Sequence, residues 1–186
     1  MKQGVIACLA MFAIDAWAQN VIGVHMQGQP LIYTDAGKPN GCGIRIVGII
    51  DSPANGKSFR SFDVSINVYS RGVAVGKVVG EVNVPTAAGN ATSTRQPLFG
   101  AWLRSGDQEP VAPVGNSFKP SSEKGAYLFQ AGLSASLDLL ISILKQQEIQ
   151  VGVRWQRDIE AIYTGTPLLQ DDERRQVVSC VEQVFK

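Results

Sequence analysis

The sequence predicts an α+β fold: a mainly antiparallel, twisted β-sheet or sandwich of about seven to nine strands, with two helices. Three observations support this fold class. Apolar and polar residues alternate strictly over residues 62–68, as in a strand with one buried face. Apolar residues at helical spacing predict a mid-chain helix at about 136–147. An acidic start followed by an apolar stripe predicts an amphipathic C-terminal helix at about 171–185.

The stretch 59–84 is predicted to form a β-hairpin with a turn at Ser70-Arg71-Gly72. If Tyr69 faces Val73 across this turn, one face places large side chains over smaller partners. The predicted pairs on that face are Val68 with Ala74, Ile66 with Gly76, Val64 with Val78, and Phe62 with Gly80. The other face is mixed, and we expect it to be partly covered.

Other strands are predicted from short apolar or alternating runs at 21–26, 31–33, 44–50, 99–103, 126–133, 149–155 and 159–163. The run 44–50 is predicted to be a central strand covered on both faces. Turn-rich composition predicts turns at 27–30 and 36–41, a loop at 51–57, and the end of the sheet at 165–167. Residues 85–97 are expected to be an exposed connection, and 105–124 a long polar loop.

In the mid-chain helix, Leu137, Leu140, Ile141 and Leu144 recur at helical spacing, with Ser134 or Ser136 as the N-cap. The run 137–143 also fits a strand, but the helix formers at 145–148 favour a helix. The C-terminal helix is expected to bury one face, formed by Val177, Val178, Cys180, Val181, Val184 and Phe185.

Residues 1–18 are predicted to be a signal peptide, which leaves 19–186 as a single globular domain. Lys2 precedes a short apolar run, and Ala16-Trp17-Ala18 fits the cleavage pattern. The run is about half of the ~20 residues that span a membrane, so a membrane anchor is the weaker alternative. A lipid on Cys8 is another alternative. The expected location is the periplasm or the outside of the cell.

The mature chain keeps two cysteines, and export predicts a disulfide between Cys42 and Cys180. Such a bridge closes a loop of roughly 140 residues, for which the chain-entropy model gives about 4–5 kcal/mol of stabilisation. Two free thiols or a redox pair are the alternatives, but no C-x-x-C spacing supports redox chemistry.

Composition and motifs argue against several functions. The net charge of +1 gives no general attraction for nucleic acid. The single histidine, His25, has no zinc-ligand spacing around it, and no nucleophile elbow or phosphate-binding loop is present. We therefore expect no metal site, no cofactor and no membrane span. Asn90-Ala91-Thr92 fits an N-glycosylation sequon.

The favoured hypothesis is an exported, non-catalytic protein, expected in a bacterial periplasm, that binds a protein partner. Candidate recognition residues are aromatic rings and arginines near strand ends: Tyr69, Arg71, Trp102, Arg104, Arg154, Trp155 and Arg157. One alternative is a carbohydrate-binding module or a secreted adhesin or toxin-binding subunit. It requires at least two of the rings of Tyr69, Trp102 and Trp155 on one surface.

A second alternative is a cell-envelope hydrolase that uses paired carboxylates. Its candidate acids are Asp63, Glu81, Asp138, Asp158 and Glu160. It requires two of these acids, or His25 with a nucleophile, to converge in a pocket.

Overall fold

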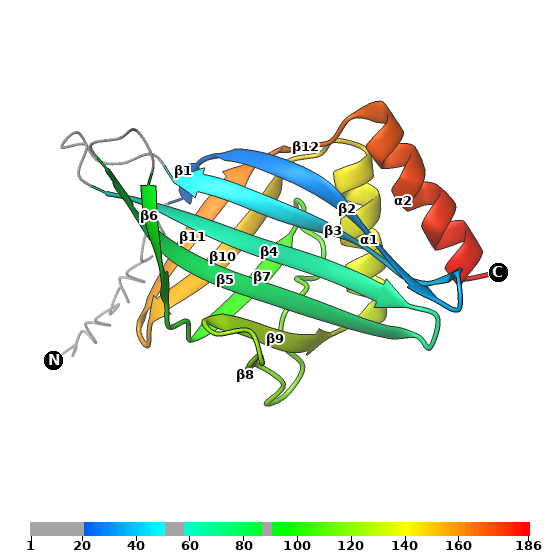
Figure 1. Cartoon of the computed structure of the whole chain (residues 1–186), viewed down its shortest axis with the longest axis horizontal. Coiled ribbons are helices and arrows are strands. Elements are labelled where there is room, and N and C mark those ends of the chain that lie inside the picture. Colours follow the sequence, from blue (N-terminus) through cyan, green and yellow to red (C-terminus); the bar gives the residue numbers. More distant parts are fainter. Residues whose placement is uncertain (1–20, 51–57, 87–90) are drawn as a thin grey trace, which may run out of the picture.

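The computed structural model describes residues 21–50, 58–86 and 91–186. These residues form an eight-stranded sheet, a four-stranded sheet and two helices (Figure 1). The predicted α+β fold class is confirmed. The predicted signal peptide, the alternative lipid site Cys8, the loop 51–57 and Asn90 of the sequon lie outside the described residues.

The large sheet has the strand order β12-β2-β3-β4-β5-β9-β8, with β6 also paired to β5. Its neighbours are antiparallel except β12, which runs parallel to β2. Its strands are β2 (His25–Asp35), β3 (Lys38–Ile50), β4 (Phe59–Tyr69), β5 (Val73–Pro85), β6 (Ala91–Gln96), β8 (Lys119–Pro120), β9 (Ala126–Ala131) and β12 (Pro167–Leu168).

The small sheet has the order β1-β11-β10-β7, in which only β1 and β11 run parallel. Its strands are β1 (Val21–Gly23), β7 (Gly100–Arg104), β10 (Ile149–Gln156) and β11 (Ile159–Gly165). The helices are α1 (Leu133–Leu144) and α2 (Asp171–Val184). β1, β8 and β12 have two or three residues each. The other strands of the described chain number nine, which agrees with the predicted range.

The β4–β5 hairpin has the predicted register. Tyr69 pairs with Val73, Ile66 with Gly76 and Phe62 with Gly80. Phe62, Val64, Ile66 and Val68 are all at most 1% exposed. Each such side chain contributes about 1.5–3 kcal/mol by leaving water. This face of the large sheet is therefore one side of the core.

Two different layers cover the inner face of the large sheet. At one end the small sheet packs on it, with Tyr163 of β11 stacked on Phe62 of β4 at 5.3 Å between ring centroids. At the other end α1 packs on β4 and β5, and α2 packs on β2 and β3 (Figure 1). The hydrophobic core joins these layers, because buried residues of both sheets and both helices form one cluster.

The predicted turn at 27–30 is wrong, because these residues lie inside the continuous strand β2. Pro30 can occupy this strand since the neighbouring β12 pairs only with Met26 and Gln27. Beyond Gln27, β2 is an edge strand of the described sheet, and edge strands tolerate proline. The turn at 36–41 is likewise shorter than predicted. Only Ala36 and Gly37 form it, both at positive φ, and β3 begins at Lys38.

The exposed connection predicted at 85–97 contains β6, which pairs with β5. Five of its six residues are exposed, so it has no apolar face that alternation could reveal. Residues 165–167 do not end the sheet, because β12 returns to pair with β2. The predicted loop at 105–124 includes β8 and a β-bridge between Val111 and Leu103.

The run 44–50 is not covered on both faces as predicted. Ile44 and Ile46 are fully buried on the inner face, but Ile49 is 50% exposed on the outer face. Arg45 also lies on that outer face, where it forms an ion pair with Asp63. The large sheet is therefore buried chiefly on one side.

α1 begins at Leu133, before the predicted Ser134 or Ser136 cap, and its N-cap is Gly132 without a side-chain hydrogen bond. The hydroxyl of Ser136 is instead inside the helix and donates to the Gly132 carbonyl. The helix ends at Leu144 rather than at 147, since Gln146 has a left-handed backbone with φ 55°. In α2, Val177, Cys180 and Val184 are buried as predicted, whereas Val178 and Phe185 are more than 40% exposed.

Candidate functional site

The strongest candidate site is the end of the large sheet where the β2–β3 and β4–β5 turns meet, at the right of Figure 1. A shallow pocket of about 330 Å³ lies between the turns. We define the tip surface as Tyr33 together with the residues that line this pocket: Asp35, Asn40, Tyr69, Ser70, Arg71 and Val73. Two of the predicted recognition residues, Tyr69 and Arg71, therefore lie on one surface.

Backbone hydrogen bonds hold the two turns together. The Ser70 amide donates to the Asn40 carbonyl at 2.9 Å, and the Gly72 amide donates to the Tyr69 carbonyl at 2.9 Å. Gly72 has φ +70°, a backbone conformation that residues other than glycine rarely adopt. These contacts position the Arg71 side chain at the exposed apex of the hairpin.

Tyr69 and Tyr33 form an aromatic pair across the end of the sheet. Their ring centroids are 5.5 Å apart, and Tyr69 lies over Gly41, where a Cβ atom would be only 2.4 Å from the ring. The Tyr33 hydroxyl donates to Asn67 Oδ1 at 3.3 Å. Burial, and secondarily the neighbouring Tyr33, raise the pKa of Tyr69, so its hydroxyl stays protonated at neutral pH.

The polar groups of the tip surface differ in how well they are paired. Asn40 Oδ1 is buried and accepts no hydrogen bond from any described residue. None of the ion pairs among the described residues includes Arg71 or Asp35. A buried side-chain carbonyl oxygen without a hydrogen bond lowers the stability of the folded state by about 1–3 kcal/mol. The exposed part of the site therefore offers one cation and one anion beside two tyrosine rings.

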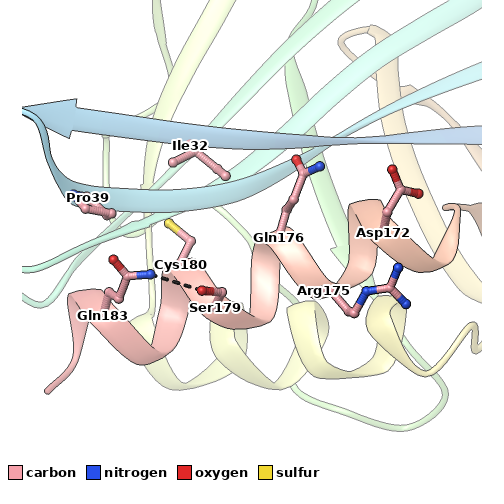
Figure 2. Close-up of a pocket in the computed structure, with 8 residues that line it drawn as sticks. All are labelled: Ile32, Pro39, Asp172, Arg175, Gln176, Ser179, Cys180 and Gln183. Carbon is pink, nitrogen blue, oxygen red and sulfur yellow. Dashed lines mark hydrogen bonds between the residues drawn. The ribbon is translucent and has the colours of Figure 1, made fainter.

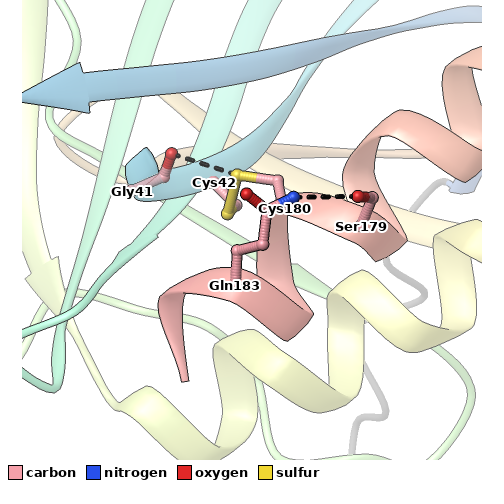
Figure 3. The surroundings of a disulfide bond; sticks show 5 residues. All are labelled: Gly41, Cys42, Ser179, Cys180 and Gln183. Atoms are coloured by element: carbon pink, nitrogen blue, oxygen red, sulfur yellow. Dashed lines mark hydrogen bonds between the residues drawn. A yellow bond between two sulfur atoms is a disulfide. The ribbon is translucent and has the colours of Figure 1, made fainter. Parts of the chain in front are cut away.

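The disulfide fixes the base of the tip surface. Cys42 and Cys180 are bonded, with their Cα atoms 5.9 Å apart, as predicted (Figure 3). Cys180 Sγ also lies 3.4 Å from the Gly41 carbonyl, one residue from Asn40. The bond joins α2 to β3 one residue after Gly41, the glycine that Tyr69 covers. The tip surface therefore rests on a covalently anchored strand.

A second hollow, of about 450 Å³, lies between α2 and the β2–β3 hairpin (Figure 2). Ile32 and Pro39 form its strand side, and Asp172, Arg175 and Gln176 lie on its helix side. Its two charged side chains have opposite signs, and it contains no second acid that could pair with Asp172 for catalysis.

The remaining candidate recognition residues lie on the small sheet and do not join the tip surface. Trp102 packs flat over Gly152 on the outer face, where the Arg104 guanidinium is 5.5 Å from its ring centroid. Arg104 also donates to Gln150 Oε1 at 2.9 Å. The predicted pairing of Trp102 with an arginine is therefore present.

Trp155 points to the other side of the small sheet and is only 9% exposed. Its cationic neighbour is Arg60, at 5.3 Å, and not the predicted Arg154 or Arg157. Arg154 lies on the opposite face of the strand, because successive side chains alternate, and pairs with Glu160 at 3.7 Å. Arg157 is exposed in the β10–β11 turn. The carbohydrate alternative required at least two of the rings of Tyr69, Trp102 and Trp155 on one surface. No two of these rings share a surface.

Three of the five acids considered for hydrolysis are in separate ion pairs. Asp63 binds Arg45, Glu81 binds Arg95, and Glu160 binds Arg154. His25 is an exposed residue at the start of β2. In the described part of the chain, no group of three or more His, Cys, Asp or Glu side chains could hold a metal ion. No helix formed by the described residues is long and apolar enough to span a membrane.

Sequence reasoning missed Tyr33 and Asn40 as members of the site. Both belong to the β2–β3 hairpin, whose register places Tyr33 opposite Gly41 and Gly41 opposite Tyr69. The missing signal was the alternation of β2 through Pro30, which the apparent turn at 27–30 obscured.

No protein-family model, curated protein or solved structure matches this chain.

Proposed function

We propose that the protein is an exported, non-catalytic binding protein that contacts a protein partner through the tip surface. The observation that carries this proposal is the paired, partly exposed rings of Tyr33 and Tyr69 beside Arg71, which is exposed and forms no ion pair with a described residue. Tyrosine and arginine are enriched at protein interfaces and dominate their binding energy.

Rigidity of the tip surface favours binding. The Cys42–Cys180 bond, the glycine beneath Tyr69 and the backbone bonds of the turns restrict the contact residues before a partner arrives. A preformed surface loses less conformational freedom on association, so more of the contact energy appears as affinity.

Export is supported by the disulfide together with the signal-like residues 1–18. Disulfides persist in oxidising compartments and are rare in reducing ones. We place the protein in a bacterial periplasm or outside the cell, after cleavage near Ala18.

The matched pair Arg71→Glu and Arg157→Glu tests this function. Both arginines are exposed in hairpin turns, but Arg71 lies on the tip surface and Arg157 lies in the small sheet. The exported protein is purified from its host with its bound partner, and the retained partner is quantified by mass spectrometry. We expect Arg71→Glu to reduce retention about tenfold or more. Arg157→Glu should leave it unchanged. Equal retention by both variants would contradict the proposal.

A further inference from the structure

A cleft of about 520 Å³ opens between the two sheets at the end of the molecule opposite the tip surface. Most of its lining residues are apolar. Ile22 and Ala161 of the small sheet face Ile50, Phe59 and Val82 of the large sheet. This volume lies within the usual range of small-molecule sites, about 300–1,000 Å³. The cleft can therefore accommodate the hydrocarbon part of a small ligand.

Three polar residues, Ser58, Arg60 and Tyr163, also line the cleft, and Arg60 and Tyr163 carry hydrogen-bond donors. Tyr163 is 1% exposed, and its hydroxyl oxygen accepts a hydrogen bond from Trp155 Nε1 at 3.0 Å. Burial raises the pKa of Tyr163, an effect that Trp155 and Arg60 partly offset. The hydroxyl therefore keeps its proton, and no described residue accepts that proton in a hydrogen bond.

Arg60 supplies the positive charge of the cleft. Its guanidinium lies 5.3 Å from the ring centroid of Trp155, and none of the ion pairs among the described residues includes it. Arginine binds carboxylates through two parallel, charge-assisted hydrogen bonds. The cleft thus combines mostly apolar walls with an arginine that forms no ion pair among the described residues and a tyrosine proton that no described residue accepts, which is the complement of an amphiphilic anion.

We propose that this inter-sheet cleft binds a small amphiphilic carboxylate, with its hydrocarbon chain between the sheets and its carboxylate on Arg60 and Tyr163. In this arrangement Arg60 donates to the carboxylate oxygens, and Tyr163 donates its free proton. Trp155 keeps the Tyr163 hydroxyl in place from behind. The cleft and the tip surface are separate sites, because they lie at opposite ends of β4: Phe59 lines the cleft and Tyr69 lines the tip surface.

Isothermal titration calorimetry with decanoate and decanol tests the proposal, since these probes share a chain and differ in the carboxylate. We expect decanoate to bind the wild-type protein at one site, and decanol to bind about tenfold or more weakly. Arg60→Gln should weaken decanoate binding by a similar factor and leave decanol unchanged. Arg157→Gln is the matched control and should change neither affinity.

Tyr163→Phe, which keeps the ring in the core, provides the second variant. It should weaken decanoate binding and leave decanol binding unchanged, with circular dichroism confirming that each variant is folded. The proposal is overturned if decanoate does not bind, if both probes bind equally, or if Arg60→Gln binds decanoate like the wild-type protein.

Discussion

Glycines under aromatic rings determine how the inner faces pack. A Cβ atom at Gly76 would lie 2.1 Å from Phe129 Cζ, and one at Gly48 would lie equally close to Phe62 Cζ. A Cβ atom at Gly80 would lie 2.5 Å from the ring of Trp155. Real Cβ atoms do not approach other atoms so closely, so any side chain at these positions must displace a core ring.

Gly76→Ala is expected to lower the free energy of unfolding by about 1–3 kcal/mol, because the new methyl group displaces Phe129. Gly100→Ala is the matched control in another strand, since its nearest neighbour would be 3.8 Å away. Urea denaturation of both variants measures the difference. An equal effect of the two substitutions would show that Gly76 is not needed for the close packing of Phe129.

Two tyrosines should make the protein sensitive to alkali. Burial raises the pKa of both Tyr163 and Tyr69 in the folded state. Below about pH 10 the folded and unfolded states both keep these protons, so the groups do not change stability there. Above that pH the unfolded state loses its protons first, and the free energy of unfolding falls as pH rises.

Urea denaturation between about pH 8 and 11, with tyrosinate absorbance followed in parallel, measures this effect. Tyr163→Phe should show a shallower alkaline decline than the wild-type protein. If Tyr163 and Tyr69 titrated near the ordinary tyrosine pKa in the folded protein, the burial assigned to them would be incorrect.

At the scale of single residues, the sequence predicts well what is local and poorly what is not. The pairing of Ile66 with Gly76 follows from a short turn and a strict alternation, and it is confirmed. The contact of Tyr33 with Tyr69 depends on two successive strand registers. An error about residues 27–30 was therefore enough to hide the contribution of the β2–β3 hairpin to the candidate site.

At the scale of elements, the disulfide joins the last helix to the sheet. Cys180 lies on the buried side of α2, and Cys42 lies in the fully buried part of β3. Without the bond, α2 keeps only the burial of one face against β2 and β3. The helix is thus the element whose attachment depends most on the oxidation state of the chain.

The double variant Cys42→Ala, Cys180→Ala should lose about 2–5 kcal/mol of unfolding free energy, with faster amide hydrogen exchange in α2. Reductant should destabilise the wild-type protein similarly and leave the double variant unchanged. If the variant unfolds at the wild-type urea concentration, the disulfide contributes nothing to holding α2.

Elements with an apolar face were predictable, and elements defined by a neighbour were not. β10 was predicted because Ile149, Val151 and Val153 alternate toward the core. β6 and β12 exist because β5 and β2 offer free backbone edges, and five of the six residues of β6 are exposed. Their own side chains carry no signal of a strand.

At the scale of the whole molecule, the long strands separate two surfaces. β4 runs from Phe59 at the inter-sheet cleft to Tyr69 at the tip surface, a distance of about 33 Å for an extended strand. The small sheet covers the cleft end of the inner face, and the two helices cover the tip end (Figure 1). The β2–β3 and β4–β5 turns at that end form the tip surface, where we propose that a protein partner binds.

Site-specific photo-crosslinking of the exported protein tests this proposal most directly. A photoreactive phenylalanine derivative replaces Arg71 in one variant and Arg157 in a second, and both are irradiated in the host cell envelope. The account predicts that position 71 captures a defined protein and position 157 does not. Arg71 lies on the tip surface, whereas Arg157 lies in the turn of the small sheet. Capture of the same protein from position 157, or from neither position, would contradict recognition by the tip surface.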